Sequence, residues 1–453
     1  MAEIRPFHAL RYAAKAGEIA GLVCPPYDVI GEEEHRALLA RSPCNAVRLE
    51  LPAGEACSGP AGRDGNEPLP QRRTPQGAEN PARDPYARAG ETLRAWLKEG
   101  VLRRDTDAGL YLYEQEFEAF GERRKLKGLL CLVRLEEFSK GIILPHEETL
   151  SKAKEDRFRL MEATGCNFSP VFALYGDEGG ATAARMAALS SGAPRYEFPL
   201  GPVVHRLWLV NDKEAIRAFC GEFAERKLYI ADGHHRYETA LRYRDQKRAE
   251  GAACEGDGYI LMLLSDMADP GLTVFPTHRL VRGAPGFDAA ALLRRCAERF
   301  EVLPRPDIAS AQAELAERAR AGEQAFAFYS GGPGWTLLVL RDPAAAAEAL
   351  PGKSEAYRGL DVSVLHSLIL ERALGIDRAD MAAQKSLAYT RSAEEAVASV
   401  RSGESRCAFL LNPTRVSQIR GVAAAGEKMP QKSTYFYPKP LAGLVFNKLD
   451  SAF

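Results

Sequence analysis

The chain has 453 residues, of which 46% are hydrophobic and 27% are charged, and its formal net charge is -1. This length is too great for one compact core and indicates two or three domains or lobes. The near-neutral charge provides no overall field that would attract nucleic acid or an anionic membrane. The N-terminus lacks the apolar stretch of a signal peptide, and no later run approaches the ~20 apolar residues of a spanning helix, so we expect a cytoplasmic protein.

The first 140 residues show periodic segments on both sides of a polar insertion. Between about 52 and 84, Gly, Pro, Glu, Arg and Asn dominate. Such a stretch buries too little apolar surface to offset the entropy of ordering it, so we predict a flexible surface insertion. Outside it the periodicity predicts a helix at 32–40, a strand at 46–51, an amphipathic helix from Tyr86 that ends at Gly100, and a hairpin with strands at 110–117 and 128–135.

The rest of the chain alternates strands and helices without a regular repeat. The sequence predicts strands at 171–175, 206–210, 228–230, 259–264, 324–329 and 335–340, and helices at 287–300 and 309–321. This order predicts an α/β or α+β fold with mixed sheets. We predict an N-terminal catalytic region at 1–285, with its core around 140–285, and a C-terminal α/β lobe at 286–453.

The segment Lys227–Glu238 carries the densest group of functional side chains. A short β-prone run ends at Ala231-Asp232-Gly233, and a helical pattern follows. Gly233 can adopt a positive φ, which lets the chain turn tightly. The free N–H groups of the following helix then lie beside His234, His235 and Arg236. This combination favours an anion, above all a phosphate.

A second group of charged residues lies at Pro145-His146-Glu147-Glu148 and the helix after it. A carboxylate beside several cations stays ionised and can act as a base, while Lys152, Lys154 and Arg157 can neutralise a polyanionic substrate. Two further segments could reach the same pocket. They are Pro276-Thr277-His278-Arg279, after an apolar strand, and the Pro/Lys/aromatic segment 429–439.

Several other patterns carry little weight. Gly352-Lys353-Ser354 has the end of a phosphate-binding P-loop, but no strand leads directly into it. Adjacent histidines on a turn seldom bind one ion together, which disfavours a dedicated transition-metal site. The nine cysteines include no Cys-x-x-Cys pair, and only Cys24, beside two prolines, is of chemical interest.

The pairing of Pro-His-Glu-Glu at 145–148 with Asp-Gly-His-His-Arg at 232–236 resembles the free-serine kinases of the ParB/sulfiredoxin-like superfamily. Over nearly its full length the chain is similar to the family called domain of unknown function 1015. The marks of that family are Pro25-Pro26-Tyr27-Asp28, Pro145-His146-Glu147, Asp156-Arg157, Asn167-Phe168-Ser169-Pro170, Asp232-Gly233-His234-His235-Arg236 and Pro276-Thr277-His278-Arg279.

The resemblance implies phosphoryl transfer to the hydroxyl of free L-serine, forming O-phosphoserine. It implies that Glu147 is the base, with Glu148 as the alternative, and that Asp232 helps to hold the acceptor or a Mg²⁺ ion. The phosphoryl group would be held by Gly233, His234, His235 and Arg236, with Lys152, Lys154 and Arg157. The substrate-binding residues would be His146, Asn167, Ser169, Thr277, His278 and Arg279.

The phosphate donor and the direction of transfer are open at this point. We favour pyrophosphate, brought with Mg²⁺, over a nucleotide, because the sequence has no nucleotide-binding glycine loop and its cations suit a compact polyanion. Two alternatives belong to other classes. One is a ParB-like nucleic-acid-binding or CTP-gated module, and the other is a non-catalytic sensor of phosphoserine.

Overall fold

The computed structural model describes residues 1–52, 84–149, 151–284, 286–383 and 385–450, so the predicted insertion at 52–84 lies almost entirely outside the described residues. The chain forms two units. The first comprises Met1–Pro145, Thr149–Thr273 and Pro438–Phe453, and the second comprises His146–Glu148 and Val274–Tyr437. None of the helices in the described ranges is both long and apolar enough to span a bilayer.

A large mixed sheet forms the centre of the first unit. Its strands follow the order β6-β11-β8-β12-β5-β4-β10-β9, with β1 paired to β5. The pairs β11–β6 and β12–β8 are parallel, whereas the other pairs are antiparallel. The strands are β1 (Ile4–Arg5), β4 (Leu110–Ala119), β5 (Glu122–Arg134), β6 (Ile143–Leu144), β8 (Val171–Tyr175), β9 (Tyr196–Leu200), β10 (Val203–Val210), β11 (Leu228–Asp232) and β12 (Tyr259–Asp266). The predicted mixed α/β class is confirmed.

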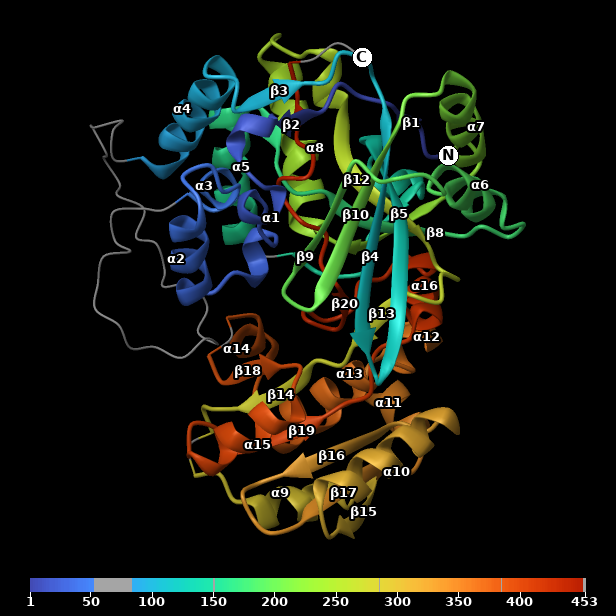
Figure 1. The fold of residues 1–453 in the computed structure, drawn as a ribbon. Helices are drawn as coiled ribbons and strands as arrows, with labels where there is room; N and C mark the ends of the chain where they lie inside the picture. Colours follow the sequence, from blue (N-terminus) through green and yellow to red (C-terminus); the bar gives the residue numbers. More distant parts are fainter. Residues whose placement is uncertain (53–83, 150, 285, 384, 451–453) are drawn as a thin grey trace. The chain divides into compact units, whose positions relative to one another are not determined.

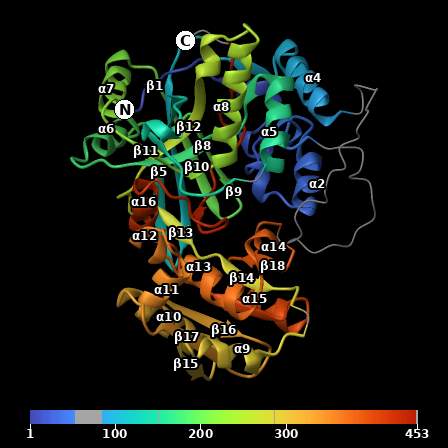
Figure 2. The same ribbon diagram turned by 180° about the vertical axis from the view of Figure 1, so that it is seen from behind.

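Helices of the first unit enclose two hydrophobic cores. One core joins the sheet to α5, α6, α7 and α8, through side chains such as Phe158, Phe219 and Tyr237. The other joins α2, α3 and α4 to the C-terminal segment through Leu38, Trp96 and Phe446 among others. Helices α5 and α8 lie side by side in both ribbon views (Figure 1 and Figure 2). The helices are α1 (Ile19–Leu22), α2 (Glu32–Arg41), α3 (Val47–Glu50), α4 (Pro85–Lys98), α5 (Ser151–Thr164), α6 (Ala181–Leu189), α7 (Lys213–Phe223) and α8 (His234–Ala249).

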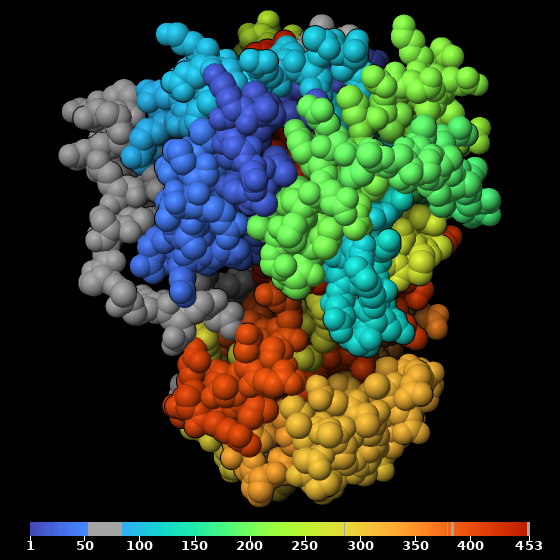
Figure 3. Space-filling model, in the orientation of Figure 1, coloured from blue at the N-terminus to red at the C-terminus, as the bar shows by residue number. Residues whose placement is uncertain are grey.

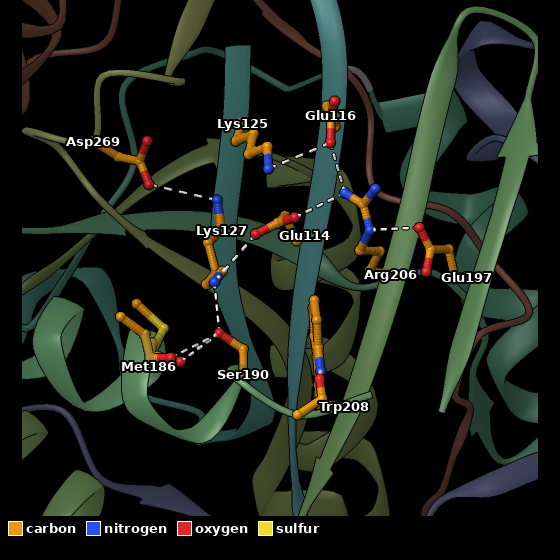
Figure 4. A network of polar contacts seen from close by, with 12 residues as sticks. Glu114, Glu116, Lys125, Lys127, Met186, Ser190, Glu197, Arg206, Trp208 and Asp269 are labelled. Carbon is orange, nitrogen blue, oxygen red and sulfur yellow. Dashed lines mark hydrogen bonds and ion pairs between the residues drawn. The ribbon is translucent and has the colours of Figure 1, made fainter. Parts of the chain in front are cut away.

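A network of charges lies on the β4–β5 hairpin and the neighbouring β10 (Figure 4). Arg206 on β10 donates to Glu114 at 3.0 Å and to Glu116 at 2.7 Å. Residues two apart on a strand share a face, so the alternating Glu on β4 meet the alternating Lys125 and Lys127 on β5. On the face shown in Figure 3 the end of this hairpin reaches the surface beside β9 and β10.

The second unit is built on a sheet with the strand order β15-β17-β16-β19-β14-β18. Helices α10 and α15 pack on it through Leu315, Ala396 and Val400 among others. Its strands are β13 (Thr273–Phe275), β14 (His278–Val281), β15 (Phe300–Arg305), β16 (Ala325–Tyr329), β17 (Trp335–Leu340), β18 (Leu387–Thr390), β19 (Cys407–Leu410) and β20 (Tyr435–Tyr437). Its helices are α9 (Ala289–Cys296), α10 (Ile308–Arg320), α11 (Ala344–Ala349), α12 (Glu355–Arg358), α13 (Asp361–Val364), α14 (Arg378–Ala383), α15 (Ala393–Arg401) and α16 (Val416–Ala424), and a π-helical segment spans Leu365–Ala373.

Two predicted elements and the predicted boundary differ from the structure. The strand predicted at 46–51 is wrong: the side chain of Asn45 accepts a hydrogen bond from the N–H of Val47 at 2.9 Å, and helix α3 begins there. The helix predicted at 287–300 ends at Cys296. The second unit begins at Val274 rather than 286, and the chain returns to the first unit at Pro438. The reason is that β14 belongs to the second sheet, whereas β21 (Asn447–Lys448) pairs with β7 (Cys166–Asn167).

Candidate functional site

The Asp-Gly-His-His-Arg motif forms the sharp strand-to-helix turn that the sequence predicts. Strand β11 ends at Asp232, Gly233 takes φ 90°, and helix α8 begins at His234. A register shift between Ile230 and Asp232 marks a bulge just before the turn. A bulge of this kind redirects side chains and is frequent beside active sites. The first N–H groups of α8, which begins with His234 and His235, therefore lie at the turn.

Asp232 is the charged centre of this turn. One of its oxygens accepts a hydrogen bond from Arg236 at 2.7 Å, and the other accepts one from the ammonium of Lys439. Burial opposes ionisation of the carboxyl, yet the charges of Lys439 and Arg236 hold the pKa of Asp232 well below its ordinary range. Asp232 is therefore a carboxylate with both oxygens engaged by cations.

Two arginines that the sequence predicts as phosphate ligands are buried, and they bond to distant parts of the chain. Arg236 also donates to the backbone oxygen of Pro170 at 2.6 Å. Arg157 donates to Asp156 and, at 2.6 Å, to the backbone oxygen of Glu50, and its guanidinium lies 4.0 Å from the ring centre of Tyr27. Both guanidinium groups thus meet protein acceptors.

A pocket in the first unit brings together several family motifs that are distant in the chain. Ser169 donates to the buried carboxylate of Glu50 at 2.8 Å, and the backbone N–H of Tyr27 donates to the same oxygen at 3.1 Å. The predicted residues Arg157, Asn167, Ser169 and Arg236 all line this pocket, although Asn167 is also tied to Asn447. The full lining is Glu50, Arg157, Leu160, Met161, Cys166, Asn167, Phe168, Ser169, Arg236, Thr239 and Ile260.

The predicted cation Lys154 is paired with Glu238 of helix α8. Its ammonium lies 2.8 Å from a carboxylate oxygen of Glu238, which also accepts a hydrogen bond from Thr149 at 2.8 Å. The side chain of Lys152 lies outside the described side chains. Lys154 therefore joins helix α5 to helix α8.

Glu147, the predicted base, lies in the second unit with the segment around Lys432. The backbone N–H of Lys432, which has φ 57°, donates to the Glu147 carboxylate. The backbone N–H of Met429 donates to the backbone oxygen of His146 at 2.7 Å, and the buried imidazole of His146 lies 3.1 Å from the hydroxyl of Thr434. These bonds fix Glu147 as a hydrogen-bond acceptor whose environment is built by residues almost 300 positions away in the sequence.

The Thr-His-Arg motif at 277–279 contributes to a second pocket, within the second unit. Thr277 and Arg279 line it together with Ser433. His278 does not: its Nδ1 accepts the N–H of Leu411 at 3.2 Å, and burial lowers its pKa to about 4. His278 is therefore a neutral, structural histidine at pH 7.

The predicted site residues thus fall into two groups, one in each unit. Arg157, Asn167, Ser169 and the Asp232–Arg236 turn belong to the first, whereas His146, Glu147 and Thr277–Arg279 belong to the second. The expectation that Glu147 faces the turn stays a prediction. Cys24 is fully buried, and burial raises the pKa of its thiol well above the ordinary value, so it is chemically inert.

Sequence reasoning missed two charged residues of these groups. Lys439, which pairs with Asp232, lies at the end of an aromatic segment, and Asp361, which lines the second pocket, lies outside all the predicted motifs. A lysine between two prolines in an otherwise aromatic segment is the available signal for Lys439. Asp361 carries no comparable signal, because an acidic residue at a helix start is ordinary.

Comparison with known proteins supports the resemblance to one family. The family model described as "Protein of unknown function (DUF1015)" matches residues 4–363, most of the chain. No curated protein is significantly similar in sequence. A family match of this extent confirms the resemblance seen in the motifs.

Solved structures with some similarity are distant. A conserved hypothetical protein from Pyrococcus furiosus is 16% identical with a TM-score of 0.35, covering 72% of this chain and 97% of its own. A free serine kinase in complex with AMP is 16% identical with a TM-score of 0.34, covering 68% and 86%. SbnI with a C-terminal truncation, from Staphylococcus aureus, is 11% identical with a TM-score of 0.34, covering 70% and 86%. At TM-scores this low, the ligands bound by those proteins are no evidence for what this chain binds.

Proposed function

The chain belongs to the DUF1015 family of proteins of unknown function. From the turn at Gly233, and from the resemblance of its motifs to those of free-serine kinases, we propose that it is a phosphotransferase acting on free L-serine. It moves a phosphoryl group between a small polyphosphate, with pyrophosphate favoured, and the serine hydroxyl, forming O-phosphoserine. The transfer exchanges one phosphoanhydride bond for one phosphoester bond, and we propose that it can run in either direction.

The observation that carries this proposal is the turn at Gly233. Its φ of 90° directs the chain into helix α8, so that the first N–H groups of the helix lie at the turn. Helix N-termini favour phosphate because their free N–H groups and the helix dipole both attract negative charge. Lys439, held beside Asp232, adds a cation to the same turn. Phosphoryl transfer needs this kind of charge neutralisation more than covalent assistance.

Glu147 serves as the base in the proposed reaction. The serine Oγ–H gives its proton to the Glu147 carboxylate while Oγ forms a bond to phosphorus, and the bond from phosphorus to the leaving phosphate oxygen breaks. The N–H of Lys432 donates to the Glu147 carboxylate and so fixes its orientation. The proposal requires Glu147 and the turn to act on the same phosphoryl group.

Magnesium enters the proposed reaction on the oxygens of the donor. Asp232 is the one residue that the family resemblance offers as a direct contact, but Lys439 and Arg236 already engage its two oxygens. A metal ion at Asp232 would have to displace a cation. The side chains at the turn therefore fit a phosphate that carries its own Mg²⁺ better than a metal held by the protein.

The decisive experiment measures turnover with each donor. Purified protein, Mg²⁺ and L-serine are incubated with pyrophosphate, ADP or ATP in turn, and O-phosphoserine is followed by phosphorus NMR. We expect product with pyrophosphate above all. Absence of product with every donor, in either direction, would reject the enzyme, and heat protection by phosphoserine without turnover would indicate a sensor instead.

A further inference from the structure

The second pocket, within the second unit, contains two opposite charges that are not paired with each other. It is a small recess that opens to solvent, and both Arg279 and Asp361 line it. Among the ion pairs of the described residues, none joins these two side chains. The remaining lining is polar: Thr277, Asn412, Thr414, Gln418 and Ser433, with Val362, Leu411 and Pro413 as the apolar part.

Arg279 brings an unsatisfied hydrogen-bond donor to this pocket. Its side chain is 1% exposed, its Nη1 donates to the backbone oxygen of Thr277, and its Nε donates to His366 at 3.3 Å. The remaining nitrogen, Nη2, is buried and has no partner among the described residues. A buried donor without a partner costs free energy, so its retention calls for an acceptor that arrives from outside. A carboxylate meets that need best, because it pairs with guanidinium through charge as well as hydrogen bonds.

Asp361 offers the complementary charge. It opens helix α13, and burial raises its pKa to about 7 although Arg415 and Asn412 favour its ionised form. Burial thus favours the neutral form of this carboxyl group, and a cation bound beside it would favour the ionised form. An ammonium group with its three donors suits such a carboxylate.

One continuous segment fixes both charges. Helix α13 runs directly into the π-helical segment Leu365–Ala373, which carries His366, the acceptor for Nε of Arg279. π-Helical turns are rare and are frequently found at functional sites. The same segment therefore supplies Asp361 to the pocket and orients Arg279 within it.

We propose that this pocket binds the zwitterionic end of an α-amino acid, with the carboxylate on Arg279 and the ammonium on Asp361. This inference rests on the proposed function in that it identifies the acceptor site, and it adds Asp361 as a specificity-determining residue. Ser433 lines the pocket, and its neighbour Lys432 holds the base Glu147. An amino acid bound in this way would present its side-chain hydroxyl near Glu147.

The test measures binding of three ligands by isothermal titration calorimetry, with no phosphate donor present. L-Serine has both charged groups, 3-hydroxypropanoate lacks the ammonium, and L-serinamide lacks the carboxylate. For the parent protein we expect L-serine to bind at least about tenfold more tightly than either analogue, since each lacks one charge-assisted contact. Equal affinity for all three ligands would overturn the proposal without any variant.

The variant Asp361→Asn tests whether Asp361 binds the ammonium group, and 3-hydroxypropanoate, which lacks that group, reports whether the pocket is still folded. We expect it to weaken L-serine binding about tenfold or more while changing the affinity for 3-hydroxypropanoate less than about threefold. Asp342→Asn, an exposed residue of the same unit outside the pocket, serves as the matched control and should behave like the parent. Equal losses for both ligands, or no loss for L-serine, would overturn the role of Asp361.

The outcome is independent of the turnover assay. If the parent forms O-phosphoserine and Asp361→Asn binds L-serine as the parent does, the phosphotransferase stands and the assignment of this pocket falls. If L-serine binding depends on Asp361 but no donor gives O-phosphoserine, the pocket stands and the phosphotransferase falls.

Discussion

Glu147 is the residue on which the proposed chemistry depends most directly. Its neighbour Glu148 is exposed, whereas the Glu147 carboxylate is held by the N–H of Lys432. A fixed orientation is what a base needs in order to meet the hydroxyl proton. Because Glu147 and Glu148 carry the same charge but differ in position, variants of the two test whether the position of the carboxylate matters.

We predict that Glu147→Gln lowers the rate of O-phosphoserine formation by about 10²- to 10⁴-fold, because the amide cannot accept the serine proton. Donor binding, followed by calorimetry with pyrophosphate and Mg²⁺, should stay close to that of the parent. Glu148→Gln is the control and should retain most of the activity. If Glu148→Gln lost activity and Glu147→Gln kept it, the roles of the two carboxylates would be exchanged.

Arg236 has a structural role that its place in the motif does not indicate. Its position in the motif predicts a phosphate ligand, but its guanidinium meets Asp232 and the backbone of Pro170. A Cβ at Gly233 would lie 2.9 Å from two of its nitrogens, so the arginine lies tightly against the turn. We infer that it holds the turn in shape.

We predict that Arg236→Ala lowers the free energy of unfolding of the first unit by about 3 kcal/mol or more, because it leaves Asp232 and a buried carbonyl without this partner. Urea unfolding measures the loss. Arg248→Ala, exposed near the end of the same helix, is the matched control and should change stability by less than about 0.5 kcal/mol. If Arg236→Ala kept the stability of the parent but bound pyrophosphate more weakly, Arg236 would instead be a phosphate ligand.

At the scale of elements, local periodicity predicted most of the fold. The hairpin and the strands β8, β11, β12, β16 and β17 follow from alternating or continuous apolar runs bounded by turn residues, and α4 and α10 follow from helical spacing. The strand predicted at 46–51 was wrong because tertiary contacts and the Asn45 hydrogen bond fold this short apolar run into a helix. Short runs of this kind fit either a strand or a buried helix.

The same limit applies to the site. The turn at Gly233 was predictable because its glycine, strand and helix are contiguous. Lys439 was not, because only the folded chain places it beside Asp232, 207 positions away. Asp361 belongs to the same category, since only the folded chain brings it to the pocket that Arg279, on another element of the second unit, also lines. Periodicity therefore identifies elements, whereas long-range charge pairs need the structure.

The charged face of the β4–β5 hairpin gives a prediction for an element. The hydrogen bond from Arg206, aided by the charges of Lys125 and Arg123, holds the pKa of Glu116 below its ordinary value of 4.5. A lowered pKa in the folded state means that ionised Glu116 stabilises the fold above about pH 4.5. This contribution is lost as the pH falls through the folded-state pKa.

We therefore predict that Glu116→Gln makes stability less dependent on pH. Between about pH 6 and about pH 3.5 the free energy of unfolding should fall less steeply for this variant than for the parent. Tryptophan fluorescence in urea can measure the difference, since Trp208 lies beside Lys127 in the same network. Glu118→Gln, exposed on the same strand, should keep the slope of the parent, and an unchanged slope for Glu116→Gln would remove the network as the cause.

At the scale of the whole molecule, the chain crosses from the second unit to the first at Pro438. The last segment then contributes more to the first unit than its length indicates. Phe446 exchanges backbone hydrogen bonds with Leu10, Ala442 does so with Cys24, and β21 pairs with β7. Phe446 also belongs to one hydrophobic core of the first unit, and Lys439 supplies the cation at Asp232.

A chain that ends at Tyr437 tests this arrangement. Removal of 438–453 deletes a strand, a core aromatic and the partner of a buried carboxylate, three changes that each destabilise a fold by about 1 to 5 kcal/mol. We predict that calorimetry shows the unfolding of the first unit at a much lower temperature, and that pyrophosphate binding is lost with it. The second unit has its own sheet and core, so its unfolding should change little and serves as the internal control. If both units kept the melting behaviour of the full chain, the final segment would be an addition to the first unit rather than part of its core.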